Sequence, residues 1–460
     1  MLHEPDRHEP LRALPWDEGR VRAAIDRIVA GTVAGCDPQR CWPTHPLDRH
    51  EAEADDPVQS TLYHGATGVV WALGYLHAVG AVAARPAVAI DCERLLELNR
   101  AWHSRYGATE HGSWLMGETP ILMMALAERP GIEADAALEA LIAGNIANPA
   151  RELMWGSPGT LLAALFLFER TGRARWAELF RVTARQLRSE LEWSETHRCA
   201  FWTQHLYGRE SSYLDAVHGF VATTSPLIRG RHLLDGAEWE AWQATIVETI
   251  SRTADREGDQ ANWRPQLNAA ASGQKRLVQF CHGAPGFVIC LADLPSRELD
   301  TLLLAAGETT WAAGPLAKGS NLCHGTGGNG YAFLKLHRRS GDPLWLERAR
   351  AFAMHGISQT ERDAERYGQG RYSLWTGDLG FAVYLWDCLR AEAQFPTLDV
   401  FFAGDLPSVE GRAFPARPRY LALRSFRNHQ GGSWGYSRSG RSPKVAFCPS
   451  VPIRADEETT

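Results

Sequence analysis

A short loop motif followed by an apolar helical segment recurs along the chain. In the clear copies, one glycine is followed three positions later by a second, and apolar residues with helical spacing come next. The five clear copies are YHGATGVVWALGYL from Tyr63, MWGSPGTLLAALFLF from Met154, CHGAPGFVICLADL from Cys281, CHGTGGNGYAFLKL from Cys323 and WTGDLGFAVYLWDCL from Trp375. Two degenerate copies are WLMGETPILMMALAE from Trp114 and VHGFVATTSPLIRG from Val217. Seven copies at intervals of roughly 40 to 65 residues indicate a repeat architecture.

The stretches between these copies predict amphipathic helices. Apolar residues recur at helical spacing, and alternating β-branched residues are sparse, in RVRAAIDRIVAGTVAG, DCERLLELNRAWHSRYG, AEWEAWQATIVETISRTADREG and DPLWLERARAFAMHG. The repeating unit is therefore a helical hairpin and the fold class is all-α. Hairpins that cannot bury an apolar face alone must stack on one another. We expect a closed α/α toroid (barrel) of seven helical hairpins, with the glycine-preceded helices inside and the amphipathic helices outside.

The toroid is expected to span residues 61–427. Residues 1–60 contain one predicted helix and a linker, whereas residues 428–460 lack periodicity and are expected to form a disordered tail. The net charge of −6 argues against a nucleic-acid partner. The longest strongly apolar stretch, Leu161 to Phe168, is too short for a membrane span, and the N-terminus lacks the pattern of a secretion signal. We therefore expect a cytoplasmic protein.

Two cysteines occupy the same position in successive copies of the loop motif. Cys281 and Cys323 each precede His-Gly, so a ring would bring them to neighbouring equivalent positions. His324 follows Cys323 directly and offers an imidazole to the same site. Two thiolates and one imidazole favour one zinc ion per chain, with its fourth coordination position open as in catalytic zinc sites. We expect His282, the neighbour of Cys281, either to support the metal ligands or to contact the substrate, and not to bind the metal.

The same segments resemble the lanthionine synthetase C-like (LanC-like) family. The pair QFCHGAPG and LCHGTGGNGYAFLKL is similar to the zinc motifs of its stand-alone, eukaryotic-type members, and SLWTGDLGFAVYLWDCLRAEAQFPTLDVF resembles their final repeat. The resemblance covers about Tyr63 to Phe401. It implies a zinc-containing α/α toroid that adds a thiol to dehydroalanine or dehydrobutyrine, forming a thioether. In the lantibiotic cyclases the thiol is a cysteine of the same peptide, whereas the stand-alone members use glutathione.

The resemblance also implies roles for individual residues. The positions that match the family's zinc ligands are Cys281, Cys323 and His324. His218, in DAVHGF, matches an acid/base histidine, and Glu152, in ELMWGSPG, falls where the family places an acidic residue. Lys318 matches a lysine that contacts the thiol in the glutathione-adding members. An imidazole with a pKa of ~6.5 suits His218 for protonating the enolate that thiol addition forms, while Glu152 would orient it or relay a proton. The motif around His218 departs from the family pattern because it lacks the second glycine.

Four other interpretations remain open from the sequence. The cysteines could be core residues beside helix-capping histidines. A zinc-dependent protein prenyltransferase subunit would also be an α/α barrel, but no cluster of Lys and Arg accompanies the loops as a diphosphate pocket requires. A glycosidase toroid would need paired carboxylates where these loops carry Cys, His and Gly. A zinc-containing scaffold that binds a peptide or glutathione without turnover would share both fold and metal.

Overall fold

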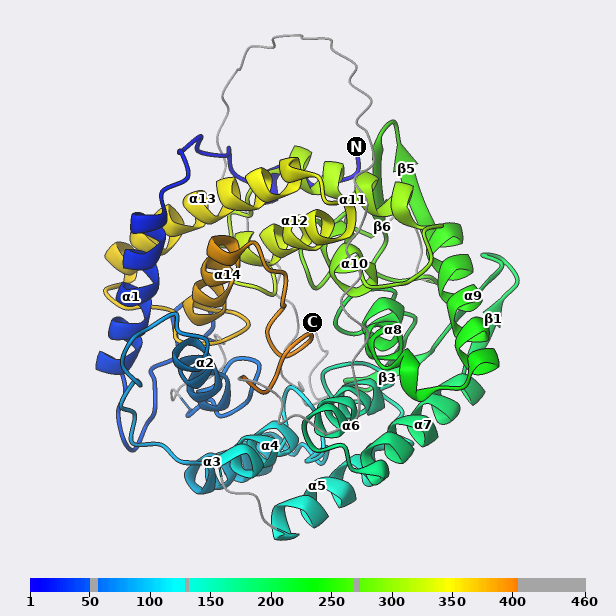
Figure 1. Cartoon of the computed structure of the whole chain (residues 1–460), viewed down its shortest axis with the longest axis horizontal. Helices are drawn as coiled ribbons and strands as arrows, with labels where there is room; N and C mark the ends of the chain where they lie inside the picture. Colours follow the sequence, from blue (N-terminus) through cyan, green and yellow to red (C-terminus); the bar gives the residue numbers. More distant parts are fainter. Residues whose placement is uncertain (50–56, 129–131, 269–273, 404–460) are drawn as a thin grey trace, which may run out of the picture.

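Fourteen α-helices form two concentric rings in this computed structural model, which describes residues 1–49, 57–128, 132–268 and 274–403 (Figure 1). The inner helices are α2 (Ala66–Ala78), α4 (Thr119–Glu128), α6 (Ser157–Thr171), α8 (Phe220–Arg229), α10 (Ala284–Leu291), α12 (Thr326–Ser340) and α14 (Asp378–Arg390). The outer helices are α1 (Glu18–Ala34), α3 (Cys92–Tyr106), α5 (Ile132–Asn145), α7 (Ala174–Ser189), α9 (Gly236–Thr253), α11 (Asp300–Ala313) and α13 (Pro343–Tyr367). Outer and inner helices alternate along the chain. The expected toroid of seven hairpins is confirmed.

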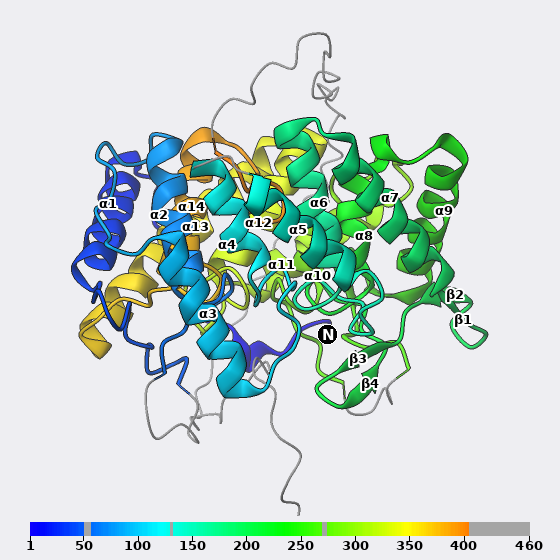
Figure 2. The same ribbon diagram turned by 90° about the horizontal axis from the view of Figure 1, so that it is seen from below.

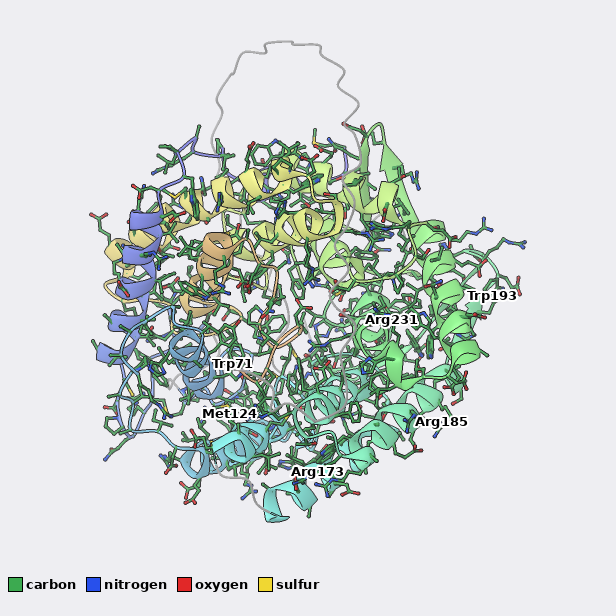
Figure 3. The ribbon with its side chains drawn as sticks, viewed as in Figure 1. Trp71, Met124, Arg173, Arg185, Trp193 and Arg231 are labelled. Carbon is green, nitrogen blue, oxygen red and sulfur yellow. The ribbon has the colours of Figure 1, made fainter. Side chains whose placement is uncertain are left out.

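The two rings differ in how much of each helix is buried. Every residue of α10 is buried, as are the residues of α6 from Ser157 to Leu167. The outer helix α7 instead buries one stripe, which includes Trp176 and Phe180. Figure 3 shows Arg185 of α7 at the outer edge of the molecule. None of the helices in the described ranges is long and apolar enough to cross a membrane.

Three short β-hairpins extend from the helical rings and were not expected from the sequence. They are β1 (Glu192–Ser194) with β2 (Cys199–Phe201), β3 (Gln204–Leu206) with β4 (Arg209–Ser211), and β5 (Ala254–Glu257) with β6 (Gln260–Trp263), all antiparallel. The expected helix AEWEAWQATIVETISRTADREG ends at Thr253, and its ADRE segment is β5. The β5–β6 pairing competes successfully with the helix because the ring of Trp263 is fully buried and stacks on Phe287 at 4.2 Å. Strands of three or four residues are too short to show a period of two in the sequence.

Backbone hydrogen bonds join the loops that precede the inner helices. At five of the seven junctions between loops, the residue two positions before the first glycine bonds to its counterpart in the next loop. The bonds run from Tyr63 N to Leu115 O (3.1 Å), Leu115 N to Met154 O (3.1 Å), Cys281 N to Cys323 O (3.0 Å), Cys323 N to Trp375 O (2.9 Å) and Trp375 N to Tyr63 O (3.1 Å). The last of these joins the seventh loop to the first. These five junctions share one register, whereas between the third and fourth loops the donor is Leu153 N, one residue earlier, which bonds to Val217 O at 3.1 Å. The bond from Trp375 to Tyr63 closes the ring.

The second glycine of the loop motif is required by close backbone contact. A Cβ atom on Gly328 would lie 1.9 Å from the carbonyl oxygen of Leu322, and one on Gly286 would lie 2.0 Å from that of Phe280. In both loops this oxygen belongs to the residue six positions earlier. Only a residue without a side chain lets the helix begin this close to its own loop.

The two ends of the described chain lie at opposite ends of the ring axis (Figure 2). The N-terminal segment crosses the loop end, where Glu9 N donates to Pro315 O (2.9 Å) and Ala317 N donates to Arg7 O (3.0 Å). The segment after α14 enters the ring, and Phe395 stacks on Phe280 at 4.7 Å between ring centroids. Helix α1 lies in the outer ring beside α14 and α13. The proposed boundary at residue 61 stays a prediction, and residues 428–460 lie outside the described part of the chain.

Candidate metal centre

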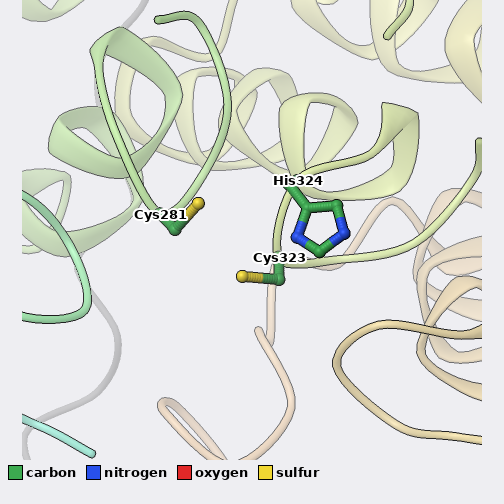
Figure 4. Close-up of side chains that lie close together, drawn as sticks. All are labelled: Cys281, Cys323 and His324. Carbon is green, nitrogen blue, oxygen red and sulfur yellow. The ribbon is translucent and has the colours of Figure 1, made fainter. Parts of the chain in front are cut away.

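Three side chains from two successive loops converge at the loop end of the ring. Cys281 precedes α10, and Cys323 and His324 precede α12; their ligand atoms all lie within 4.8 Å of one another (Figure 4). Both cysteines are fully buried. The hydrogen bond from Cys281 N to Cys323 O holds the two backbones side by side, so the sulfurs meet because of the shared register. The structure therefore brings together the three residues that were predicted from the sequence to be metal ligands.

The donor set fits a zinc ion. Nδ1 of His324 is buried and has no hydrogen-bond partner among the described residues, and Figure 4 shows this edge of the ring turned towards the two sulfurs. Burial lowers the pKa of His324 well below its usual value, and the positive charges of Arg371, Lys318 and Arg7 lower it further. The imidazole is thus neutral, as a metal ligand must be. Two sulfurs and one neutral nitrogen suit zinc better than magnesium or calcium.

A buried carboxylate orients His218, the predicted acid/base histidine. Oε2 of Glu152 lies 2.9 Å from Nδ1 of His218, and both side chains are almost completely buried. The carboxylate is itself fixed, because Oε2 accepts the N–H of Met154 (2.8 Å) and Oε1 accepts the N–H of Trp155 (2.5 Å). The family resemblance implied that Glu152 orients His218, although the two residues lie in different repeats and their spacing alone does not indicate contact. A carboxylate held this way fixes both the ring orientation and the tautomer of the histidine.

A second pair of the same kind lies on the neighbouring loops. Oδ2 of Asp215 lies 2.8 Å from Nδ1 of His282, while Oδ1 accepts the N–H groups of Val217 (3.0 Å) and His218 (2.7 Å). Burial alone would raise the pKa of Asp215, but the charge and hydrogen bond of His282 hold it below its usual value. The ring of Tyr213 lies near both histidines, at 5.7 Å from His218 and 6.3 Å from His282. His218 and His282 thus belong to one site.

The acidic residues of both pairs share a position in the repeat. Glu152 and Asp215 lie four residues before the first glycine of their loops, and each accepts the backbone N–H three residues further on. Asn321 holds the same position before His324 and accepts its backbone N–H at 3.0 Å. Asp215 was missed from the sequence, although this shared position was a signal that could have identified it.

Lys318 lies half-buried on the loop before Cys323, and its charge is one of those that lower the pKa of His324. It is therefore near the candidate ligands, as the sequence suggested. The charges of Arg7 and Arg371 also lower the pKa of His324, and neither residue was predicted from the sequence to belong to the site. Arg371 also forms an ion pair with Asp48, in which its Nε lies 2.7 Å from Oδ2. The charge of Arg371 is therefore compensated by Asp48, while Lys318 and Arg7 also place positive charge near His324.

Comparisons with known proteins agree with this arrangement. A family model described as lanthionine synthetase C-like protein matches residues 56–400. A segment of 182 residues is 37% identical to glutathione S-transferase LANCL1 of Danio rerio and covers 37% of this chain and 45% of that protein. A segment of 139 residues is 35% identical to LanC-like protein GCL1 of Arabidopsis thaliana and covers 27% of this chain and 31% of that protein. In each comparison the chain spans less than half of the relative's length.

A solved structure shares the fold. Nisin cyclase superposes with a TM-score of 0.55 over 80% of this chain and 95% of that chain, at 15% sequence identity. Identity this low shows a common architecture and nothing about the reaction.

Proposed function

Because this chain belongs to the lanthionine synthetase C-like family, we propose that it is a zinc-dependent enzyme that adds a thiol to dehydroalanine or dehydrobutyrine. The product is a thioether, and the thiol is that of glutathione or of a peptide cysteine. The observation that carries the proposal is the convergence of Cys281, Cys323 and His324 within 4.8 Å. Asp215 contacts both His282, which follows Cys281 directly, and the backbone of His218, whose ring a buried carboxylate orients. Three protein ligands leave the fourth position of a tetrahedral zinc ion for a substrate.

Different residues of the site would perform metal binding and proton transfer. Cys281, Cys323 and His324 would hold the metal. When bound, zinc lowers the pKa of a coordinating thiol, so that the substrate sulfur reacts as a thiolate at neutral pH. His218 would protonate the α-carbon after the sulfur has attacked the β-carbon, with Glu152 orienting its ring. Both side chains are buried, which restricts water from competing as a proton donor.

The charges around the site support glutathione as the thiol. Lys318 and Arg7 place positive charge near His324, and glutathione carries two carboxylates. Lys318 suits one of these carboxylates because an ammonium group places few geometric demands on its partner. His282, held by Asp215, would contact the same substrate. The relative from Danio rerio is named as a glutathione S-transferase, which favours the same assignment.

A cyclase that joins a cysteine and a dehydroamino acid of one precursor peptide is the second candidate. The shared fold with nisin cyclase is compatible with it. A scaffold that keeps zinc and binds glutathione or a peptide without turnover is the third. The two reactions differ in their thiol, whereas the scaffold gives no product, so one set of incubations separates them.

The first experiment measures metal content. The purified protein should contain about one zinc per chain, and Cys323→Ala should lose it. Cys388→Ala is the matched control, because Cys388 is equally buried but lies on α14 outside the ligand group. A folded, active protein without zinc would overturn the proposal.

The second experiment measures adduct formation by mass spectrometry, with a dehydroalanine peptide and either glutathione or an internal cysteine as the thiol. His218→Ala should keep zinc and lose the adduct. His355→Ala removes another buried histidine, one that binds Glu9 at 2.7 Å, and should keep the activity. If the wild-type protein does not accelerate the reaction over the free thiol, the scaffold interpretation replaces the enzyme.

A further inference from the structure

Each candidate ligand sulfur accepts a hydrogen bond from a buried side chain. The hydroxyl of Tyr63 donates to Sγ of Cys323 at 2.9 Å, and Nε2 of Gln279 donates to Sγ of Cys281 at 2.9 Å. The two donors are each only 2% exposed. The two sulfurs therefore share both their position in the repeat and a buried hydrogen-bond donor.

Closure of the ring positions the first donor. Tyr63 holds the same loop position as Cys281 and Cys323, but in the first repeat. Its backbone oxygen accepts the N–H of Trp375 from the last repeat, and its ring lies 5.9 Å from that of Trp375. The hydroxyl can thus reach a sulfur that is 260 residues away in the sequence.

The N-terminal segment positions the second donor. Nη2 of Arg7 donates to Oε1 of Gln279 at 3.1 Å. A guanidinium group can only donate, so the amide oxygen must face Arg7 and the amide NH₂ must face the sulfur of Cys281. Asp215 and Asn321, at the same repeat position as Gln279, instead accept a backbone N–H of their own turn.

We propose that Tyr63 and Gln279 determine which sulfur in the site reacts. The inference rests on the proposed function, in which the ligand cysteines are thiolates next to an electrophilic double bond. A hydrogen bond stabilises the negative charge on a thiolate and so makes it a weaker nucleophile. Both ligand sulfurs carry such a bond, which leaves the incoming substrate thiol as the more reactive sulfur.

The side reaction that these bonds suppress is addition of a ligand cysteine to the acceptor. The sulfur of Cys323 would form a bond to the β-carbon of dehydroalanine, and the electron pair of the double bond would move to the α-carbon and its carbonyl. A proton added at the α-carbon completes the step, which needs no oxidant or reductant. The product is a thioether on the protein, and the site has lost one ligand.

The test uses the full-length, zinc-loaded protein with a dehydroalanine peptide and no added thiol. Zinc content is measured first, and modified cysteines are then located by peptide mapping. Tyr63→Phe should accumulate the thioether on Cys323, and Gln279→Leu on Cys281, each about tenfold or more faster than wild type. Arg7→Leu should increase modification of Cys281 alone, because Gln279 loses the partner that orients it.

The matched control is Tyr384→Phe. The hydroxyl of Tyr384 is fully buried and donates to the carbonyl oxygen of Ala349 at 2.5 Å, away from the ligand group. It should leave both ligand cysteines modified at the wild-type rate. Faster modification in the control would mean that general loosening, and not the bond to sulfur, exposes the ligands.

Two results would overturn the inference. One is a wild-type rate in both Tyr63→Phe and Gln279→Leu. The other is loss of zinc from these variants before any electrophile is added, which would mean that the bonds retain the metal and do not select the nucleophile. A wild-type protein that contains no zinc would overturn the proposed function itself, and the initial metal measurement separates that case.

Discussion

Replacement of Glu152 by glutamine should destabilise the protein because the site cannot satisfy an amide. Oε1 accepts the N–H of Trp155, while Oε2 accepts the N–H of Met154 and binds His218. Glutamine offers one oxygen and one NH₂ group. If the NH₂ replaces Oε1, Trp155 N–H has no acceptor, and if it replaces Oε2, Met154 N–H has none. Either orientation leaves one buried backbone donor unpaired.

The magnitude follows from these bonds. A buried unpaired donor costs about 1–3 kcal/mol, and loss of a hydrogen bond to a charged group costs about 1.5–3 kcal/mol. We expect the free energy of unfolding of Glu152→Gln to fall by the sum of the two, about 2.5–6 kcal/mol. Adduct formation should fall as well, because the ring of His218 loses the carboxylate that fixes its tautomer.

Asp215→Asn is the matched comparison. The oxygen of asparagine can keep both backbone bonds, which come from Val217 and His218, and its NH₂ then faces His282. Nδ1 of His282 can accept this bond in its other tautomer, so no backbone donor is orphaned. The expected loss is about 1.5–3 kcal/mol, from the charged bond alone.

The assay is urea unfolding of the zinc-loaded variants at pH 7, followed by tryptophan fluorescence and by circular dichroism. Coincident transitions by the two probes are needed before the midpoints are converted to free energies. The reasoning is refuted if Glu152→Gln is as stable as wild type, or if Asp215→Asn is the more damaging change.

Three further predictions concern packing, pH and substrate. Gly328→Ala should lower the melting temperature of the protein, because the new Cβ would lie 1.9 Å from Leu322 O. Gly74→Ala in α2 should instead stabilise the folded protein by about 0.5–1 kcal/mol, because the space around its Cβ is open. Equal effects of the two substitutions on the melting temperature would contradict the role proposed for Gly328. Burial raises the pKa of Asp387 to about 7, so the folded state binds this proton more tightly and stability falls as pH rises from about 4 to about 7. Asp387→Asn should reduce that fall in unfolding experiments at pH 5 and pH 8, and an unchanged pH profile would exclude Asp387 as its source. Lys318→Ala should raise KM for glutathione with a smaller change in kcat, and Lys318→Arg should restore part of the affinity; a kcat effect alone would remove Lys318 from substrate binding.

Local patterns in the sequence predicted most of the helices and their order along the chain. The seven inner helices begin after the seven predicted loops, including the degenerate loops before α4 and α8. The errors arose where tertiary contacts outweigh a local pattern, as in β5, whose residues continue the helical pattern of α9 but pair with β6. Helix α13 is also longer than the segment DPLWLERARAFAMHG that predicted it, because it continues to Tyr367.

For the site, the residue types and their shared register could be predicted from the sequence. The structure then showed which of those residues touch. Cys281, Cys323 and His324 do meet, and their role as zinc ligands stays a prediction for the metal analysis. Glu152 and His218 form a pair that no spacing indicated, and Asp215 joined the site only when its contact with His282 was seen.

The sequence by itself determined the repeating hairpin and the equivalence of Cys281 and Cys323. Both follow from short-range rules, because helical periodicity and the need for glycine at a close contact act within one repeat. The tertiary structure alone decided that Tyr63 meets Cys323, that Arg7 meets Gln279, and that Asp215 meets His282. These contacts depend on the rotation from each hairpin to the next, summed around a closed ring. These rotations cannot be predicted from any single segment of the sequence.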